Sequence, residues 1–367
     1  MTRLTHADTS AHREHWGGAA ARSFWLDFRR EVRSSFQSFS PEVPPSAHEK
    51  RFWARAWPFA RAMFFRLSPA RRTIFLFSIL LLLTSPFIAS ALPQIATIYR
   101  PSLAAICLLI LLALELADRV ALKRDLEVAR DIQKWLLPHA PPSLPGLDIA
   151  FTTRPANTVA GDYYDVLSLG DAAGCDPGVL FVIADVAGKG IPAGLLMACF
   201  RTRLHTLSRS TGDLADLVAT LERGCCDDSY NGCRFTTAFL ARYDPATRSL
   251  FYVNAGHNPP LLRSSSRPIV ELDAGGLPFG MFPDTTYALG QVVVGPGDLL
   301  LMYTDGVVEA ANEAGDEFGL DRLHAFLRGT AGSAADCQQQ LFASIDAFTG
   351  RAPQHDDITC LIVQFSG

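Results

Sequence analysis

The sequence predicts an α+β domain of packed strand and helix layers, preceded by two transmembrane helices and a linker helix. Three observations support this prediction. Short β-type runs alternate with separate helical stretches from Leu147 onwards, which is typical of a layered α+β domain rather than a series of βαβ units. Residues 73–99 carry no charged side chain, and basic residues are concentrated before them.

Composition restricts the class of protein. The chain has 367 residues, 49% of them hydrophobic, and a net charge of −4, so it is not intrinsically disordered. Residues 1–72 hold 13 Lys or Arg and 6 Asp or Glu, while the rest of the chain has a net charge of −11. Because so acidic a body repels phosphates, we expect no nucleic-acid partner. The eight cysteines form no CxxC pair, which argues against a structural zinc site.

The first 72 residues are interpreted as a basic cytoplasmic arm. Between Lys50 and Arg72, arginines alternate with aromatic residues, a composition that suits the headgroup layer of a membrane. An interfacial helix is therefore one interpretation of this segment. A soluble helix with a core-facing side is the other.

Residues 73–117 are predicted to form a transmembrane helical hairpin. The stretch Ile74–Leu92 contains 12 Leu, Ile or Phe residues, and about 20 apolar residues suffice for a span. The second candidate, Pro101–Ala117, is shorter and includes Glu115, so a buried soluble helix is its alternative. Basic residues flank both outer ends of the hairpin. The positive-inside rule then places the N-terminus and the main domain in the cytoplasm, at the inner membrane.

Residues 118–137 are predicted to form a linker helix. Apolar residues recur on one face at spacings of three and four, and the helix ends at Leu137, before Pro138. This face suits either pairing with a second copy in a homodimer or packing on the chain's own domain, and both interpretations stay open. Residues 138–367 form the predicted main domain.

Four aspartates in that domain share one context, the end of a hydrophobic strand beside glycine or another acid. They are Asp162, Asp185, Asp305 and Asp356, the last followed by Asp357. A carboxylate at the end of a buried strand is costly unless it is hydrogen-bonded or neutralised. Any one of them alone could simply cap a turn. If they converge, two hard divalent cations such as Mn²⁺ or Mg²⁺ would offset their repulsion, because these ions take oxygen ligands.

The motifs around these aspartates resemble a known family. In order and spacing, VAGDYYD, DVAGKGIPAGLLMA, NAGHNPPLL, YTDGVVEA and HDDITCLIV are similar to motifs of bacterial metal-dependent (PPM-type) serine/threonine protein phosphatases of the SpoIIE/RsbU group. The preceding ARDIQKWLLP is similar to the family's linker helix. The resemblance covers about Leu126 to Phe365 and leaves residues 1–120 uncovered. The chain also lacks the Cys-x5-Arg and Gly-x-Ser-x-Gly motifs of enzymes that use a side-chain nucleophile.

The resemblance implies a β-sandwich flanked by helices on both faces, in α-β-β-α layers. It implies two bound cations, Mn²⁺ or Mg²⁺, and a water that attacks phosphorus without a side-chain nucleophile. Its implied ligands are the Asp162, Asp185, Asp305 and Asp356 carboxylates and the Val186 carbonyl, whereas the resemblance implies a supporting role for Asp357 beyond the direct ligands.

The sequence departs from the family pattern at two positions. Ala160 replaces a common glycine, and Lys189 stands where many relatives have histidine. An exposed loop lysine is the first interpretation of Lys189, and a role near the substrate is the alternative. We interpret His257 as a residue that holds a turn by hydrogen bonding, with substrate contact as the alternative. His355 is expected to lie beside the site.

The resulting hypothesis is a membrane-anchored phosphatase acting on phosphoserine or phosphothreonine of a regulatory protein, such as an anti-sigma-factor antagonist. A non-catalytic, membrane-tethered adaptor of a partner-switching pathway is the alternative. The sequence assigns no residue to substrate binding.

Overall fold

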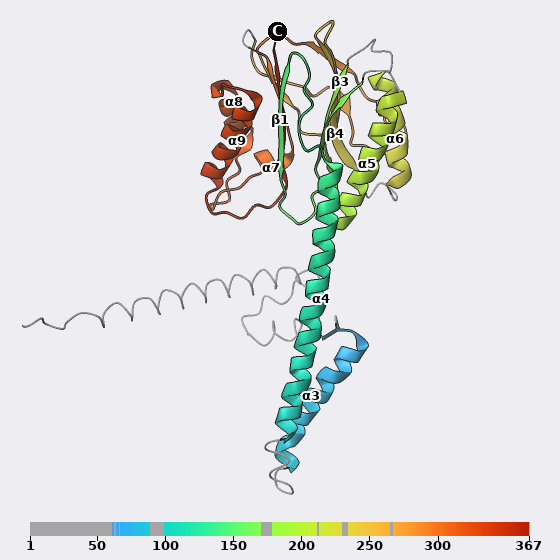
Figure 1. Cartoon of the computed structure of the whole chain (residues 1–367), viewed down its shortest axis with the longest axis vertical. Helices are drawn as coiled ribbons and strands as arrows, with labels where there is room; N and C mark the ends of the chain where they lie inside the picture. The colour runs from blue at the N-terminus through green and yellow to red at the C-terminus, as the bar shows by residue number, and fades with distance from the viewer. Residues whose placement is uncertain are drawn as a thin grey trace, which may run out of the picture. The chain divides into compact units, whose positions relative to one another are not determined.

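The computed structural model divides the chain into two compact units, residues 1–120 and 121–367 (Figure 1). The predicted basic arm lies almost wholly outside the described residues. The structure describes residues 61, 64–65, 67–88, 99–169, 178–210, 213–229, 234–264 and 267–366.

The first unit contains an antiparallel helix pair. Helix α3 spans Pro69–Ile88, and helix α4 begins at Arg100. Arg71 near the start of α3 pairs with Glu115 at 3.2 Å and Asp118 at 2.6 Å on α4. These ion pairs hold the start of α3 against the middle of α4.

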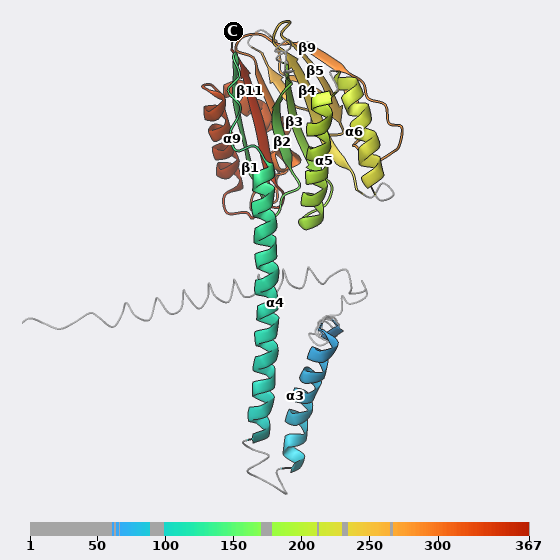
Figure 2. The ribbon, with the colours of Figure 1, turned by 45° about the vertical axis from the view of Figure 1, so that its right-hand side comes forward.

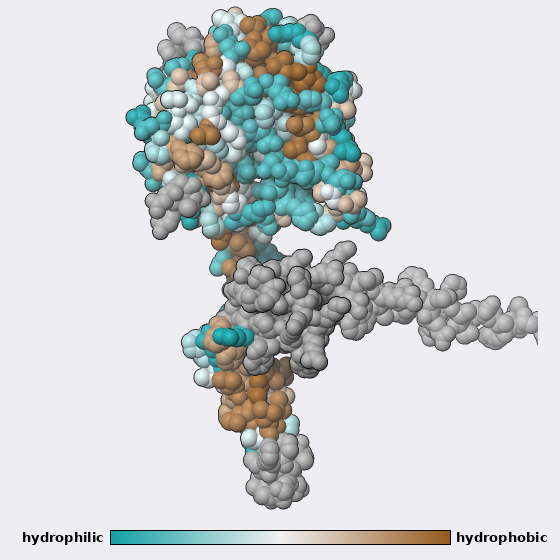
Figure 3. All heavy atoms as spheres, turned by 180° about the vertical axis from the view of Figure 1, so that it is seen from behind, coloured by the Kyte–Doolittle hydropathy of each residue, from teal (hydrophilic) through white to brown (hydrophobic). Residues whose placement is uncertain are grey.

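The prediction that α3 and α4 cross a membrane is not supported by the structure. No helix in the ranges it describes is both long enough and apolar enough to span a bilayer. Charges limit the apolar length, because α3 carries Arg71 and Arg72 in its first turn and α4 carries Glu115 and Asp118. Both helices nevertheless expose large apolar side chains, which gather on this unit in Figure 3.

The predicted second span and linker helix form a single helix. Helix α4 extends over Arg100–Leu136, and neither glycine nor proline interrupts it after Pro101. In its last turns the buried side follows the predicted apolar face at Leu126, Ala129 and Leu136, which are partly buried. It departs from that face at Ile132, which is exposed, and the adjacent Gln133 is buried instead.

The second unit is built on two sheets. The first has the strand order β1-β11-β10-β6-β7 and the second has the order β2-β3-β4-β5-β8, with β9 also paired to β5. The strands of the first sheet are β1 (Leu147–Arg154), β6 (Leu261–Arg263), β7 (Val270–Glu271), β10 (Leu299–Tyr303) and β11 (Ile358–Phe365). Those of the second sheet are β2 (Tyr163–Ser168), β3 (Val179–Val186), β4 (Thr236–Asp244), β5 (Ser249–Ala255), β8 (Gly275–Gly276) and β9 (Gly290–Val293).

Helices cover both outer faces of the sandwich, as predicted. Helices α5 (Ile191–Ser210) and α6 (Leu214–Asp228) pack on the second sheet, and α8 (Gly319–Gly329) and α9 (Ala334–Thr349) flank the first (Figures 1 and 2). A short helix, α7 (Asp305–Val308), follows β10 directly. The α-β-β-α order of layers is therefore confirmed.

Side chains of the first sheet point alternately to its two faces and so contribute to two separate cores. Along β11, Ile358, Cys360 and Ile362 pack toward α8 and α9, while Leu361 and Val363 belong to the core shared with the second sheet. Successive side chains of a strand point to opposite faces, so a strand buried on both faces is apolar at nearly every position. This is why β11 has an almost unbroken apolar sequence.

Candidate metal centre

The predicted aspartates lie at one edge of the sandwich because of the strand register. In the second sheet, Tyr163 at the start of β2 pairs with Ala184 near the end of β3. Asp162 and Asp185 are the next residues outward on these two antiparallel strands. In the first sheet, Tyr303 at the end of β10 pairs with Cys360 of β11, so the residues just after β10 and just before β11 share an edge.

Hydrogen bonds connect these two edges. The Thr304 hydroxyl donates to Asp162 Oδ2 at 2.9 Å, and the Thr359 hydroxyl donates to the same oxygen. Both threonines belong to the first sheet and its connections, whereas Asp162 begins the second. The ends of the two sheets therefore meet around the buried Asp162 carboxylate.

Asp357 holds the loop that leads into Asp162. Its Oδ1 accepts a hydrogen bond from the Ala156 N–H at 2.7 Å, and its Oδ2 accepts one from the Gly161 N–H at 2.9 Å. Each oxygen of the carboxylate is thus bonded to a backbone amide. Hydrogen bonds of this kind stabilise an ionised carboxylate and fix the backbone that donates them.

Two glycines permit the close backbone approaches at this edge. A Cβ at Gly306 would lie 2.1 Å from the Asp357 carbonyl oxygen. A Cβ at Gly161 would lie 3.0 Å from the Val186 carbonyl oxygen and 3.1 Å from Asp185 Oδ1. The backbone beside Asp162 therefore packs directly against the end of β3, and the backbone beside Asp305 packs against the start of β11.

The carboxylates repel one another. Burial and the neighbouring Asp185 carboxylate raise the pKa of Asp162 well above its usual value. Burial, followed by the charges of Asp305 and Asp356, raises the pKa of Asp185 to about 7. The pKa of Asp305 is also raised, first by burial and then by Asp356. Like charges within a few ångströms have this effect, and a cation among them would reverse it.

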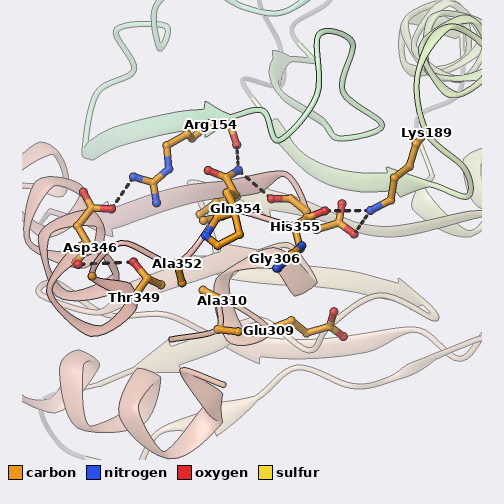
Figure 4. Close-up of a pocket in the computed structure, with 15 residues that line it drawn as sticks. Arg154, Lys189, Gly306, Glu309, Ala310, Asp346, Thr349, Ala352, Gln354 and His355 are labelled. Atoms are coloured by element: carbon orange, nitrogen blue, oxygen red, sulfur yellow. Dashed lines mark hydrogen bonds and ion pairs between the residues drawn. The ribbon is translucent and has the colours of Figure 1, made fainter. Parts of the chain in front are cut away.

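Lys189 partly offsets this negative charge. Its ammonium group lies 2.9 Å from Asp356 Oδ2 and donates a further hydrogen bond to the His355 carbonyl at 3.1 Å. The hydrogen bond to Asp356 raises the pKa of Lys189. The lysine is half exposed, as expected, but it lies beside the carboxylates rather than apart from them (Figure 4).

The donor set fits hard divalent cations. It consists of carboxylate oxygens from both sheets, with no histidine or thiol among the predicted ligands, and such sets favour Mg²⁺ or Mn²⁺. As the side chains stand in the described part of the chain, no group of three or more His, Cys, Asp or Glu residues is arranged to hold a metal ion. Two of the carboxylates have other partners in this arrangement. Asp162 accepts from the two threonine hydroxyls, and Asp356 pairs with Lys189.

His257 is buried between the two sheets, close to the aspartates. Its Nε2 lies 3.1 Å from the Tyr303 carbonyl oxygen and its Nδ1 lies 3.0 Å from the Thr237 hydroxyl. Since a carbonyl only accepts, Nε2 carries the proton and Nδ1 accepts from Thr237. Burial lowers the pKa of His257 to about 4, so the ring is neutral at pH 7. The His257 ring therefore joins β4 to β10 by hydrogen bonding, whereas the Asn254 side chain holds the turn itself, through the His257 N–H and carbonyl.

A cavity of about 320 Å³ adjoins the carboxylates. Its wall includes Lys189, Asp356 and His355 on one side, and Arg154, paired with Asp346 at 2.6 Å, on the other (Figure 4). Small residues of the segments that follow α7 and α9 also line it. The sequence predicts Asp356 and His355 at or beside the site but no substrate-binding residue, because the walls of this cavity come from four separate segments of the chain.

Comparison with known proteins identifies relatives of this unit. Residues 176–366, just over half of the chain, match the family model for stage II sporulation protein E (SpoIIE). The chain is 29% identical over 283 residues to protein IcfG of Synechocystis sp., covering 69% of this chain and 43% of IcfG. It is 27% identical over 244 residues to phosphoserine phosphatase RsbU of Bacillus subtilis, covering 66% of this chain and 70% of RsbU.

A solved structure shares the architecture. The SiaA-PP2C domain of Pseudomonas aeruginosa superposes with a TM-score of 0.60 at 25% identity. The match covers 68% of this chain and 99% of that domain. The two-sheet sandwich with outer helices is therefore the PP2C-like fold.

Replacing Gly306 by alanine tests the close approach at this edge. The new Cβ would clash with the Asp357 carbonyl, so the start of α7 must move away from the start of β11 and carry Asp305 with it. We expect Gly306→Ala to lower the free energy of unfolding by about 1–3 kcal/mol and to weaken Mn²⁺ binding. Denaturant unfolding and isothermal titration calorimetry measure the two effects. The control is Gly329→Ala, where no atom lies within 4 Å of the added Cβ. Equal stability and equal Mn²⁺ affinity for both variants would contradict the expectation.

Proposed function

Because the chain belongs to the SpoIIE family, we propose that it is a metal-dependent protein phosphatase that hydrolyses phosphoserine or phosphothreonine on a regulatory protein. One observation carries this proposal: aspartates from the ends of both sheets meet at one edge of the sandwich, with the pKa of three of them raised. Such an edge suits cations and the phosphate group that they bind.

The ligands that we propose are those predicted from the sequence. The cations would be held by the Asp162, Asp185, Asp305 and Asp356 carboxylates together with the Val186 carbonyl. When bound, two divalent cations lower the pKa of water and offset the charge of the phosphoryl oxygens. The protein supplies the fixed carboxylates, and Asp357 holds the loop that carries Asp162. Lys189 adds a positive charge within reach of an anionic substrate.

The cavity supports a protein as the substrate. It adjoins Asp356 and Gly306, so a phosphorylated side chain placed at the carboxylates would bring its flanking residues against the cavity wall (Figure 4). RsbU, a relative, is named a phosphoserine phosphatase. We propose a small phosphorylated regulator, such as an anti-sigma-factor antagonist, as the substrate class.

Phosphate release from a phosphoserine peptide tests the catalytic proposal. We expect turnover with Mn²⁺, loss of turnover with EDTA, and a fall in kcat/KM of about 100-fold or more for Asp185→Asn or Asp305→Asn, since each removes a charged ligand. The control is Asp321→Asn, which changes an exposed carboxylate on α8. A wild-type chain that binds Mn²⁺ but releases no phosphate from any phosphopeptide would instead support a non-catalytic adaptor.

We further propose that α4 pairs with its copy in a homodimer. Val128, Ile132 and Trp135 recur at helical spacing and are 53%, 49% and 75% exposed, so they form an uncovered apolar stripe. We expect residues 121–367 to sediment as a dimer and Ile132→Lys to shift them to monomer in analytical ultracentrifugation. The control is Lys123→Ala, on the same helix. A wild-type chain that stays monomeric at concentrations up to about 100 µM would contradict the pairing.

We also propose that the N-terminal unit associates with the inner membrane. Leu83 of α3 and Leu109 of α4 are 66% and 64% exposed, and similar side chains surround them. We expect the full chain, but not residues 121–367, to float with lipid vesicles in a density gradient. A carbonate wash then separates surface association from insertion. A full chain that stays at the bottom of the gradient would refute membrane association.

A further inference from the structure

The loop between β1 and β2 carries Asp162 but has no strand partner. Residues 155–162 form bends and extended backbone without a ladder. Val159 and Ala160 are nonetheless buried, so their backbone polar groups require partners other than water. The partners of Ala160 come from a different part of the chain.

Gln133, near the end of α4, satisfies both backbone groups of Ala160. Its Nε2 donates to the Ala160 carbonyl at 2.7 Å, and the Ala160 N–H donates to its Oε1 at 3.0 Å. The side chain is 6% exposed and Ala160 is 2% exposed. A planar amide with one donor and one acceptor can form such a pair, in the way that two strand residues do.

The chemistry of this pair is specific to glutamine. Glutamate lacks the N–H donor for the Ala160 carbonyl, and asparagine is shorter by one methylene. Both hydrogen bonds are buried, so losing them leaves unsatisfied polar atoms rather than solvated ones. A displacement of the last turn of α4 by one residue, about 1.5 Å along the helix, would break both bonds.

Asp357, which directly precedes β11 of the first sheet, holds the same loop. Its bonds to the Ala156 and Gly161 amides flank the two bonds that Gln133 makes to Ala160. Gly194 of α5 also approaches, since a Cβ there would lie 2.6 Å from Val159 Cγ1. The backbone that leads to Asp162 is therefore held by the side chains of Gln133 and Asp357, and α5 packs against Val159 beside Gln133.

We propose that Gln133 is a positioning residue that couples the end of α4 to Asp162. The position of α4 sets the position of Ala160, and Ala160 sets that of Asp162, two residues further along. This inference rests on the proposed function in one respect, namely that Asp162 binds a cation. The hydrogen bonds between Gln133 and Ala160 do not depend on that role.

Hydrogen exchange and Mn²⁺ titration on the full chain test the coupling. In the wild type, we expect the Ala160 amide to exchange slowly although it lies in a loop. In Gln133→Met, which keeps the length but removes both polar atoms, we expect residues 156–162 to exchange at least about tenfold faster and the Mn²⁺ Kd to rise about tenfold, the equivalent of one or two lost hydrogen bonds. The sheet core should keep its protection.

The control is Gln339→Met, which makes the same substitution at an exposed position on α9 and should change neither quantity. If Gln133→Met fails to fold, Gln133→Asn keeps the amide but shortens its reach, and the same local loss is expected. Unchanged exchange and unchanged Mn²⁺ affinity would overturn the proposal. Faster exchange throughout the domain, in proportion to a lower stability, would also overturn it in favour of a purely structural role.

The two measurements separate this inference from the proposed function. A wild-type chain that binds no Mn²⁺ overturns the metal site, and the exchange result alone then decides whether Gln133 holds the loop. A wild type that binds Mn²⁺ with an affinity equal to that of Gln133→Met keeps the metal site and rejects the coupling.

Discussion

The mutual repulsion of carboxylates at one edge of the sandwich is the constraint on which the rest of the second unit depends. Three of these carboxyl groups have a raised pKa, with burial as the first cause and neighbouring aspartates as the next. A cluster of this kind lowers the stability of the folded chain when no cation is bound, so the surrounding packing must be strong enough to hold it. The two buried cores on either side of the first sheet supply that packing.

The register of the strands brings the aspartates at the strand ends close together. Asp162 and Asp185 are neighbours because β2 and β3 are antiparallel, and Asp305 lies near Asp356 because β10 and β11 are antiparallel. Threonines then join the two edges through Asp162. None of these contacts involves residues close in sequence, which is why each aspartate by itself carried little information.

Much of the fold was predictable from sequence because its signals are local. The short β-type runs and the separate helical stretches after Leu147 are predicted from local sequence patterns, and the ordered motifs resemble those of a family whose fold is the sandwich. The convergence of the carboxylates was a hypothesis from resemblance, since no local pattern encodes it. The two spans are predicted from apolar length and from the basic residues that flank them, whereas no helix in the described residues is long and apolar enough to cross a membrane.

Gln133 shows why the remaining contacts were missed. The apolar face predicted for the linker included Ile132, which is exposed, and omitted Gln133, which is buried. A hydrophobic pattern cannot identify a buried polar side chain, because its burial depends on a partner elsewhere in the fold. Here the partner is a loop without strand pairing, whose backbone groups need side chains to satisfy them. Buried polar contacts of this kind cost free energy if any atom moves, so they constrain position more strictly than apolar contacts do. Gln133, which we propose positions the loop of the candidate metal centre, therefore lies where the hydrophobic pattern fails.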